Sequence, residues 1–259
     1  TGVLQRDRSR PNMGPHEVRA IAMRVQDRVR AQFNWALDQD IHVAHRLSQR
    51  ITTESSNRHM WTASGREQSL ESLIDRLEEG PVATVGAAAE PAEVEMALSE
   101  GYRLVFADGS IGVISELSAD YQDKAWSDTL LLVSDGDGDP YIDEAAQRGI
   151  LHAIHAHGDN EESLISMIDR LIALEVPPAV LLTHQTPDRI EGMLNPGGFT
   201  DGDRAVCLCA FLGVPVETIR LIGYTTSEIG RWTGNTDPIR KMRKLTFMQE
   251  VLDGLGVGG

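Results

Sequence analysis

The sequence contains little cysteine and too few basic residues to balance its acidic ones. The two cysteines, Cys207 and Cys209, lie two residues apart in a segment expected to be helical, where they point to different faces, so no disulfide framework is expected. Basic residues number 24 against 39 acidic residues, and the formal net charge is −15. A surface of this sign repels the phosphates of nucleic acids and of anionic lipids. We therefore expect neither nucleic acid nor a membrane as a partner.

Long apolar runs are also missing from the sequence. No stretch approaches the roughly 18 apolar residues of a membrane-spanning helix, and nothing near Thr1 has the apolar core of a signal peptide. A cytoplasmic protein is therefore expected. Residues 1–13, rich in arginine and polar types, are expected to form a mobile tail.

The apolar residues that are present predict a folded α/β chain with a helical N-terminal region. With 259 residues, of which 41% are hydrophobic, the chain is long enough to bury a core. Residues 1–80 show no convincing strand. Helical periodicity predicts two amphipathic helices over 15–51 and a third over 66–79. Strand and helix signals alternate over 81–259, which we expect to form the α/β domain.

The alternating part of the chain predicts a mostly parallel sheet. Short apolar strands are expected at 82–85, 103–107, 129–134, 151–154, 179–183 and 218–222. Helices are expected at 92–100, 111–117, 142–149, 161–174 and 201–212. Strands and helices that alternate at this interval form βαβ crossovers, whose helices cover both faces of the sheet. The expected fold class is therefore doubly wound α/β.

Polar motifs that directly follow strands are the candidates for a site, because ligands of such sheets bind outside the carboxyl ends of the strands. Four motifs qualify, at 107–110, 134–139, 155–160 and 183–185. A fifth polar stretch, at 195–204, is a loop that leads into a predicted helix.

The motif at 134–139 places three carboxylates, those of Asp135, Asp137 and Asp139, within five residues. Like charges this close repel one another unless a cation lies among them, and hard oxygen ligands favour Mg²⁺ or Ca²⁺ over zinc. An acidic surface turn is the alternative. A calcium loop of the EF-hand type does not fit, because Pro140 stands where that loop needs glycine and Ala146 where it needs a glutamate.

The segment 155–160 places two imidazoles, a carboxylate and an amide directly after a strand. Its functional interpretation is phosphate contact from His155 or His157 and metal ligation by Asp159. Zinc is disfavoured, because no nearby cysteine completes a tetrahedral set. The structural alternative is a histidine satisfied inside the sheet, with Asp159 and Asn160 capping the next helix.

The loop at 195–204 combines a permissive backbone with charge. Gly197 and Gly198 permit conformations that bring backbone amides close to an anion. Thr200 fits an N-cap, and Asp203 three residues later nearly completes a capping box, which explains Asp203 structurally.

Asp201 and Arg204 indicate a site at the start of this helix. The helix N-terminus and Arg204 both carry positive charge that suits a phosphate. Asp108 follows the second strand and would lie at the same edge of the sheet, with a simple turn as the alternative.

The densest basic group of the chain lies near its C-terminus. Asp237 and Pro238 predict the start of a helix. This helix carries Arg240, Lys241, Arg243 and Lys244. Most such groups are solvated helix faces, and phosphate binding is the alternative.

Two of these motifs resemble the archaeal 6-hydroxymethylpterin diphosphokinase family. They are His-Ala-His-Gly-Asp-Asn at 155–160 and Gly-Gly-Phe-Thr-Asp-Gly-Asp-Arg-Ala at 197–205. The acidic run at 135–139 and Ala-Asp-Gly at 107–109 are similar to acidic motifs of the same family. The resemblance covers roughly residues 81–225.

The chain departs from the family pattern at two places. The loop at 86–91 reads Gly-Ala-Ala-Ala-Glu-Pro, where the family tends to carry a Gly-Pro-Ser type of loop. Gly136 stands where a larger residue is expected.

The resemblance implies a fold similar to that of thiamine diphosphokinase and a Mg²⁺-dependent reaction. Diphosphate would pass from ATP to 6-hydroxymethyl-7,8-dihydropterin, with release of AMP, on the route to tetrahydrofolate or methanopterin-type carriers. A thiamine diphosphokinase-type enzyme that acts on another alcohol is the nearest alternative. A catalytically inactive protein that binds nucleotide or metal is the second. A homodimer is expected from the fold.

The candidate residues receive roles under this interpretation. The metal ligands are Asp135, Asp137, Asp159 and Asp201. The catalytic residues are Asp137, Asp159 and His157. Of these, Asp159 or a histidine would take the proton of the alcohol. ATP is contacted by Asp108, His155, Asn160, Gly197, Gly198, Thr200 and Arg204. Asn195 and Phe199 are candidates for contact with the pterin.

Overall fold

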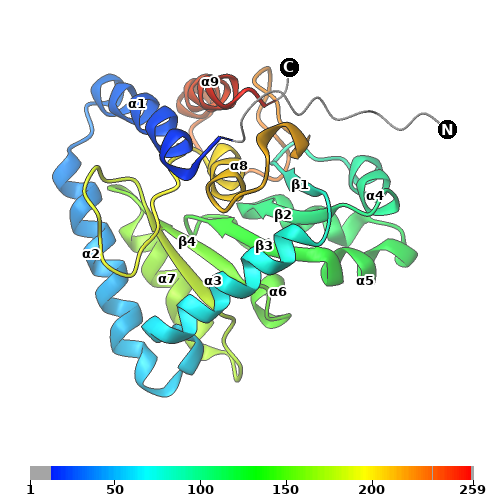
Figure 1. Ribbon diagram of the computed structural model, residues 1–259, viewed down its shortest axis with the longest axis horizontal. Coiled ribbons are helices and arrows are strands. Elements are labelled where there is room, and N and C mark those ends of the chain that lie inside the picture. The colour runs from blue at the N-terminus through cyan, green and yellow to red at the C-terminus, as the bar shows by residue number, and fades with distance from the viewer. Residues whose placement is uncertain (1–12, 235, 258–259) are drawn as a thin grey trace.

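The computed structural model describes residues 13–234 and 236–257 and shows a parallel sheet with helices on both faces (Figure 1). The expected tail, except for Met13, lies outside the described residues. The strands are β1 Val82–Val85, β2 Arg103–Ala107, β3 Thr129–Ser134, β4 His152–Ala156, β5 Val180–His184 and β6 Arg220–Ile222. The α-helices are α1 Pro15–Phe33, α2 Leu37–Glu54, α3 Ala63–Glu78, α4 Pro91–Ser99, α5 Ala119–Asp128, α6 Tyr141–Gln147, α7 Glu161–Ala173, α8 Asp201–Phe211 and α9 Pro238–Leu255. Short 3₁₀ helices are η1 Ser55–Asn57, η2 His59–Trp61, η3 Asp108–Glu116 and η4 Val216–Thr218.

In the described part of the chain, all strands pair in parallel, in the order β5-β4-β3-β2-β1-β6. Successive side chains of a strand point to opposite faces. In β2, Leu104 and Phe106 join the core that contains α4 to α7, whereas Val105 and Ala107 join the core that contains α8 and α9. The prediction of a doubly wound, mostly parallel α/β fold is therefore confirmed.

The N-terminal helices pack on both layers of helices. α1 contacts α8 and α9, whereas α2 contacts α7, β4 and β5 (Figure 1). Each of these helices buries an apolar stripe with helical spacing, as in Val43, Leu47 and Ile51 of α2. α1 ends at Phe33, its C-cap Asn34 has a left-handed φ of 53°, and the chain then turns into α2. This turn brings the start of α2 next to the segments that follow β4 and β5.

The predicted elements agree with the structure except around η3 and α5. Three strand predictions match at both ends, and the other three are displaced by one or two residues. The helical stretch predicted at 111–117 is of the 3₁₀ type and is part of η3, which begins at Asp108 and ends at Glu116. Its glycines allow close packing: a Cβ on Gly112 would lie 2.6 Å from Tyr141. Helix α5 was not predicted, and its single buried residue, Ala125, explains why it shows no apolar stripe.

The described helices combine apolar and charged faces. None of those within 13–234 and 236–257 is long and apolar enough to cross a membrane.

Candidate functional site

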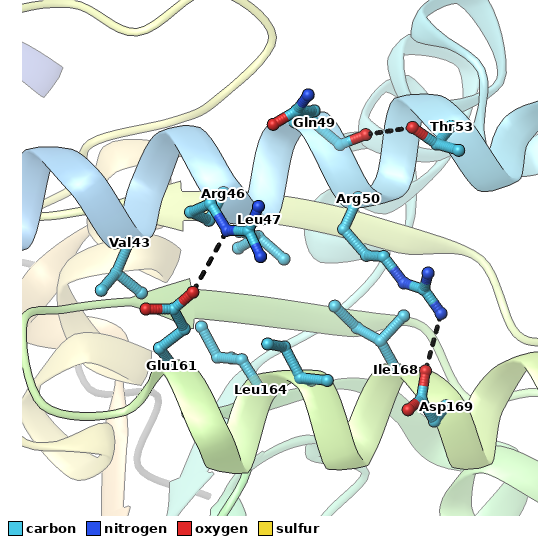
Figure 2. A pocket seen from close by; sticks show the side chains of 11 residues that line it. Val43, Arg46, Leu47, Gln49, Arg50, Thr53, Glu161, Leu164, Ile168 and Asp169 are labelled. Atoms are coloured by element: carbon cyan, nitrogen blue, oxygen red, sulfur yellow. Dashed lines mark hydrogen bonds and ion pairs between the residues drawn. The ribbon is translucent and has the colours of Figure 1, made fainter.

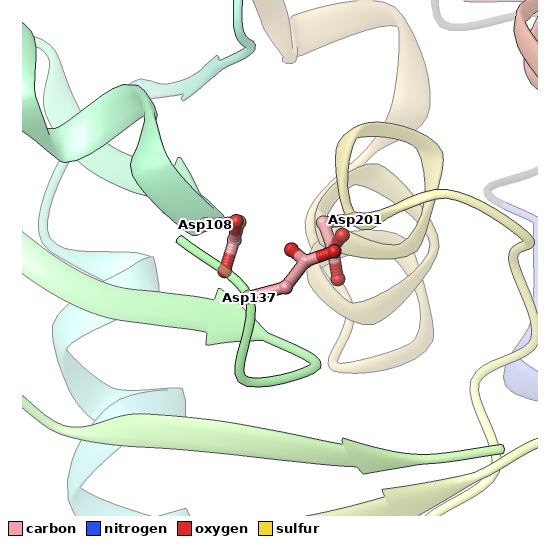
Figure 3. Close-up of side chains that lie close together, drawn as sticks. All are labelled: Asp108, Asp137 and Asp201. Carbon is pink, nitrogen blue, oxygen red and sulfur yellow. The ribbon is translucent and has the colours of Figure 1, made fainter. Parts of the chain in front are cut away.

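Aspartates from three separate segments converge at the carboxyl ends of β2 and β3 (Figure 3). Asp108 follows β2, Asp137 lies in the loop after β3, and Asp201 is the first residue of α8. One carboxylate oxygen of each lies within 4.8 Å of the other two. We call Asp108, Asp137 and Asp201 the acidic triad.

The backbone and a neighbouring strand hold Asp108 in place. Its φ is 51°, in the left-handed region that residues other than glycine rarely adopt. The hydroxyl of Ser134, at the end of β3, donates to Asp108 Oδ1 over 2.6 Å. Gly138 leaves room for the carboxylate, because a Cβ there would lie 2.6 Å from both Asp108 oxygens. The unusual backbone conformation of Asp108 and the missing side chain of Gly138 therefore fix the position of this carboxylate.

Burial and repulsion between carboxylates both destabilise the ionised form of the triad. Burial, followed by repulsion from Asp201 and Asp135, raises the pKa of Asp108 to about 7. Repulsion from Asp135 raises the pKa of the exposed Asp137. Burial, followed by repulsion from Asp135, raises the pKa of Asp201. Among the described residues, Arg204 is the one cation that forms an ion pair with the triad, from Nη1 to Asp201 Oδ1 over 2.6 Å.

A second acidic group lies beside the triad, but its charges are paired. His157 donates from Nε2 to Asp135 Oδ2 over 3.0 Å and from Nδ1 to Asp159 Oδ1 over 2.7 Å. Arg240 of α9 also pairs with Asp159. We call Asp135, His157, Asp159 and Arg240 the histidine bridge.

The histidine bridge balances two carboxylates with two cations. Both ring nitrogens of His157 face carboxylates, so the ring is protonated. Burial alone lowers the pKa of His157, but the bonds to Asp135 and Asp159 outweigh it and raise the pKa to about 9. The bond from His157 lowers the pKa of Asp159. For Asp135, burial acts in the opposite direction, and the bond from His157 outweighs it, so the pKa is lowered.

Two residues of the segment 155–160 that are predicted to contact ATP, His155 and Asn160, use their polar side-chain atoms in hydrogen bonds within the protein. His155 is 0% exposed, with Nε2 lying 3.3 Å from Gln185 Oε1 and Nδ1 2.9 Å from Thr183 Oγ1. Asn160 accepts from one backbone amide through Oδ1 and donates to two backbone carbonyls through Nδ2. In this arrangement neither side chain has a free polar atom for a phosphate.

The glycines before α8 allow close packing. Gly197 and Gly198 have φ of 82° and 92°. A Cβ on Gly197 would lie 2.2 Å from Ala22 Cβ in α1, and a Cβ on Gly198 would lie 2.6 Å from Arg204 Cα. These contacts explain both glycines without a ligand.

The first turn of α8 positions Asp201. Thr200 is the N-cap and forms the predicted capping box with Asp203, whose Oδ1 accepts from the Thr200 amide over 2.7 Å. Arg204 is 1% exposed and donates to the carbonyl of Phe199 over 2.9 Å as well as to Asp201. Its guanidinium therefore orients Asp201 from within the protein.

The structure divides the predicted metal ligands between the two groups. Asp137 and Asp201 belong to the acidic triad, and the other two lie in the histidine bridge. Asp108, predicted as an ATP contact, completes the triad. Asp139, the last of the acidic run, pairs with an arginine of α7 outside both groups.

The N-terminal helices also contact this region, through Asp40 of α2. Asp40 is 3% exposed and accepts from the Gly158 amide over 2.7 Å and from Gln185 Nε2 over 3.1 Å. It therefore holds the turn that carries His157. The sequence feature that could have identified Asp40 is its place on the apolar face of α2, four residues before the buried Ala44.

A pocket opens beside the triad. It is lined by the triad, by the loop 86–88 after β1, by residues of the segment 223–234 after β6, and by Lys241 and Lys244 of α9. The Ala88 amide donates to the carbonyl of Gly223 over 3.0 Å, so part of the loop at 86–91 holds the chain after β6 in place.

A second groove lies between α2 and α7 (Figure 2). Two ion pairs, Arg46 with Glu161 and Arg50 with Asp169, bridge it above an apolar floor. It contains none of the predicted site residues, so the chemistry is to be sought at the triad.

The acidic triad fits a hard divalent cation. Carboxylate oxygens are the ligands that Mg²⁺ prefers in proteins. A cation would also remove the repulsion that raises the pKa of Asp108, whereas the histidine bridge already contains its own counter-charges. The triad is therefore the better metal site of the two.

Comparison with known proteins gives relatives of a single kind. No family model matches the chain. Proteins named 6-hydroxymethyl-7,8-dihydropterin pyrophosphokinase are similar in Pyrococcus furiosus, with 36% identity over 45% of this chain and 48% of that protein, and in Methanocaldococcus jannaschii, with 33% identity over 36% of each. The chain thus matches about half or less of the length of these two relatives. The protein of that name in Methanothermobacter thermautotrophicus is 30% identical over 63% of this chain and 67% of its own length. At that identity and coverage, the chain belongs to the 6-hydroxymethyl-7,8-dihydropterin pyrophosphokinase family.

Proposed function

We propose that the protein transfers diphosphate from ATP to 6-hydroxymethyl-7,8-dihydropterin in a Mg²⁺-dependent reaction. The observation that carries the proposal is the convergence of Asp108, Asp137 and Asp201 at one edge of the sheet, next to a pocket. The names of the relatives supply the substrates.

The residues of the chain would divide the work of binding and orientation. Asp108, Asp137 and Asp201 would hold Mg²⁺, which supplies neutralisation of the phosphate charges. Arg204 fixes the orientation of Asp201, and Ser134 fixes that of Asp108. This arrangement suits phosphoryl-type transfer, which needs aligned reactants and charge neutralisation more than covalent help.

In the proposed reaction, the alcohol oxygen of the pterin forms a bond to the β-phosphorus of ATP. The bond from that phosphorus to the α,β-bridging oxygen breaks, AMP leaves with this oxygen, and the alcohol loses its proton. His157 is already protonated and Asp159 has a lowered pKa, so both are weak bases. A loose transition state makes a strong base dispensable, so the proton of the alcohol can pass to solvent.

The test is AMP formation from ATP and the pterin alcohol, with Mg²⁺ varied, in the parent and in Asp137→Asn. Loss of one carboxylate of the triad should reduce turnover by about 10²–10³-fold, from the several kcal/mol that a bound metal contributes. Asp139→Asn is the matched control, because Asp139 belongs to the same acidic run but pairs outside the triad. Equal activity of Asp137→Asn and the parent would exclude the triad as the metal site.

Substrate identity is tested by replacing the pterin. Faster AMP formation with thiamine than with the pterin alcohol would assign the protein to the alternative diphosphokinase reaction. Binding of Mg²⁺ and ATP without AMP formation for either alcohol would indicate a nucleotide-binding protein without this activity.

A further inference from the structure

Most of the cations around the candidate site are already paired with carboxylates. Arg204 pairs with Asp201, and His157 and Arg240 pair with carboxylates of the histidine bridge. Each of these cations already has part of its charge offset by a carboxylate, which weakens its attraction for a phosphate. A polyphosphate in the pocket therefore needs other cations.

Two lysines of α9 meet this need. Lys241 and Lys244, which are three residues apart and thus on one face of the helix, both line the pocket that contains the acidic triad. In the described part of the chain, neither ammonium group forms an ion pair or a hydrogen bond. Arg243, from the same basic run, is exposed and is not part of the lining.

The aromatic rings below Lys244 hold its ammonium near the pocket. Lys244 Nζ lies 5.6 Å from the ring centre of Trp35 and 5.7 Å from that of Phe199. Ring faces attract cations without using the three hydrogens of an ammonium group. The N–H groups of Lys244 therefore remain available to anionic oxygens.

The pocket thus combines carboxylates that fit a divalent cation with two ammonium groups that form no direct ion pair among the described residues. A polyphosphate bound to Mg²⁺ satisfies both, because its oxygens bind the cation and also accept from ammonium groups. A ligand without negative charge would leave the lysines unpaired, and a metal ion alone would do the same.

We propose that Lys241 and Lys244 form a polyphosphate subsite in the pocket that the acidic triad also lines. The inference deepens the proposed function, because it identifies the residues that would receive the phosphates of ATP. It differs from the expectation that His155 and Arg204 make these contacts.

The experiment measures binding of inorganic tripolyphosphate in the presence of Mg²⁺ by calorimetry, with the full chain. Lys241→Gln and Lys244→Gln should each weaken binding by about 10- to 100-fold, as expected for loss of a charge-assisted hydrogen bond. Arg243→Gln is the matched control, since it removes the same charge from the same helix outside the pocket. It should change the affinity by less than about threefold.

Two outcomes would overturn the inference. Equal weakening in all three variants would indicate a general electrostatic field, and unchanged affinity in Lys241→Gln and Lys244→Gln would exclude contact. Near-ultraviolet circular dichroism reports whether each variant keeps its fold. Lys241 lies over no aromatic ring in the described residues, so Lys241→Gln carries the test if Lys244→Gln fails to fold.

The subsite and the proposed function fail in distinguishable ways. Tripolyphosphate binding that depends on Lys241 and Lys244, without AMP formation from ATP and the pterin, refutes the reaction alone. AMP formation with an unchanged KM for ATP in both lysine variants refutes the subsite alone.

Discussion

The acidic triad and the histidine bridge lie side by side at one edge of the sheet, yet they differ in how their charges are balanced. The bridge sets two carboxylates against His157 and Arg240. The triad has three carboxylates and, among the described residues, a single ion pair, with Arg204. The number of acids therefore does not identify a cation site. The lack of internal counter-charge does, because only a bound cation then offsets the repulsion.

The largest expected effect comes from removing the one cation of the triad. Arg204→Met should lower the free energy of unfolding by about 3–5 kcal/mol, because a buried charge loses its partner. Urea denaturation measures the change. Arg220→Met, which breaks the more exposed pair with Glu100, should cost about 1 kcal/mol or less. If the two variants are equally stable, Arg204 does not support the triad.

The histidine bridge should be visible in the pH dependence of stability. The pKa of His157 is raised from 6.5 to about 9, so its stabilising contribution is complete below pH 6.5 and is lost as the pH rises through 9. The loss should amount to about 3 kcal/mol at most, measured from urea curves between pH 6 and 10. His157→Gln should remove the part of this loss that comes from the imidazolium and leave the part that comes from the raised pKa values of Asp108 and Asp137. The exposed His59, changed to Gln, should leave it as it is; a flat curve in the parent would contradict the bridge.

Mg²⁺ should distinguish the two groups directly. At about 100 times its Kd, Mg²⁺ should raise the free energy of unfolding of the parent by about 2.7 kcal/mol, because it binds the folded chain. Asp137→Asn should abolish this gain, and Asp159→Asn should keep most of it. A thermal-shift titration measures both. The reverse pattern would move the metal site to the histidine bridge.

The smallest effect is expected at the exposed end of the bridge. Arg240 and Asp159 have side chains that are 42% and 41% exposed, so solvent screens their attraction. Arg240→Gln should lower the free energy of unfolding by less than about 1 kcal/mol in urea. A loss of several kcal/mol would mean that the pair of Arg240 and Asp159, and not the imidazolium of His157, contributes most of the stability of the histidine bridge.

Local sequence was sufficient to predict most of the fold. The strands β1, β2 and β3 were predicted at both ends, because buried parallel strands are short apolar runs between turn residues. The capping box of α8 was also readable, since Thr200 and Asp203 are three residues apart. Helix α5 was not, because its contacts bury only Ala125.

The site could be predicted only as a set of candidates. Asp135 and Asp137 are two residues apart and look equivalent in the sequence, but one accepts from His157 and the other faces Asp108 and Asp201. Asp40 gave still less indication, because its partners follow β4 and β5, more than a hundred residues away.

By itself, the sequence determined the parallel α/β class, the motifs that follow the strands and the acidic character of the site. These features depend on periodicity and on neighbours along the chain, which the sequence displays directly. The tertiary structure alone decided which carboxylates share a cation site and which share an imidazolium. That division depends on distances between segments brought together by folding, and the interaction of charges is set by distance and burial, not by order along the chain.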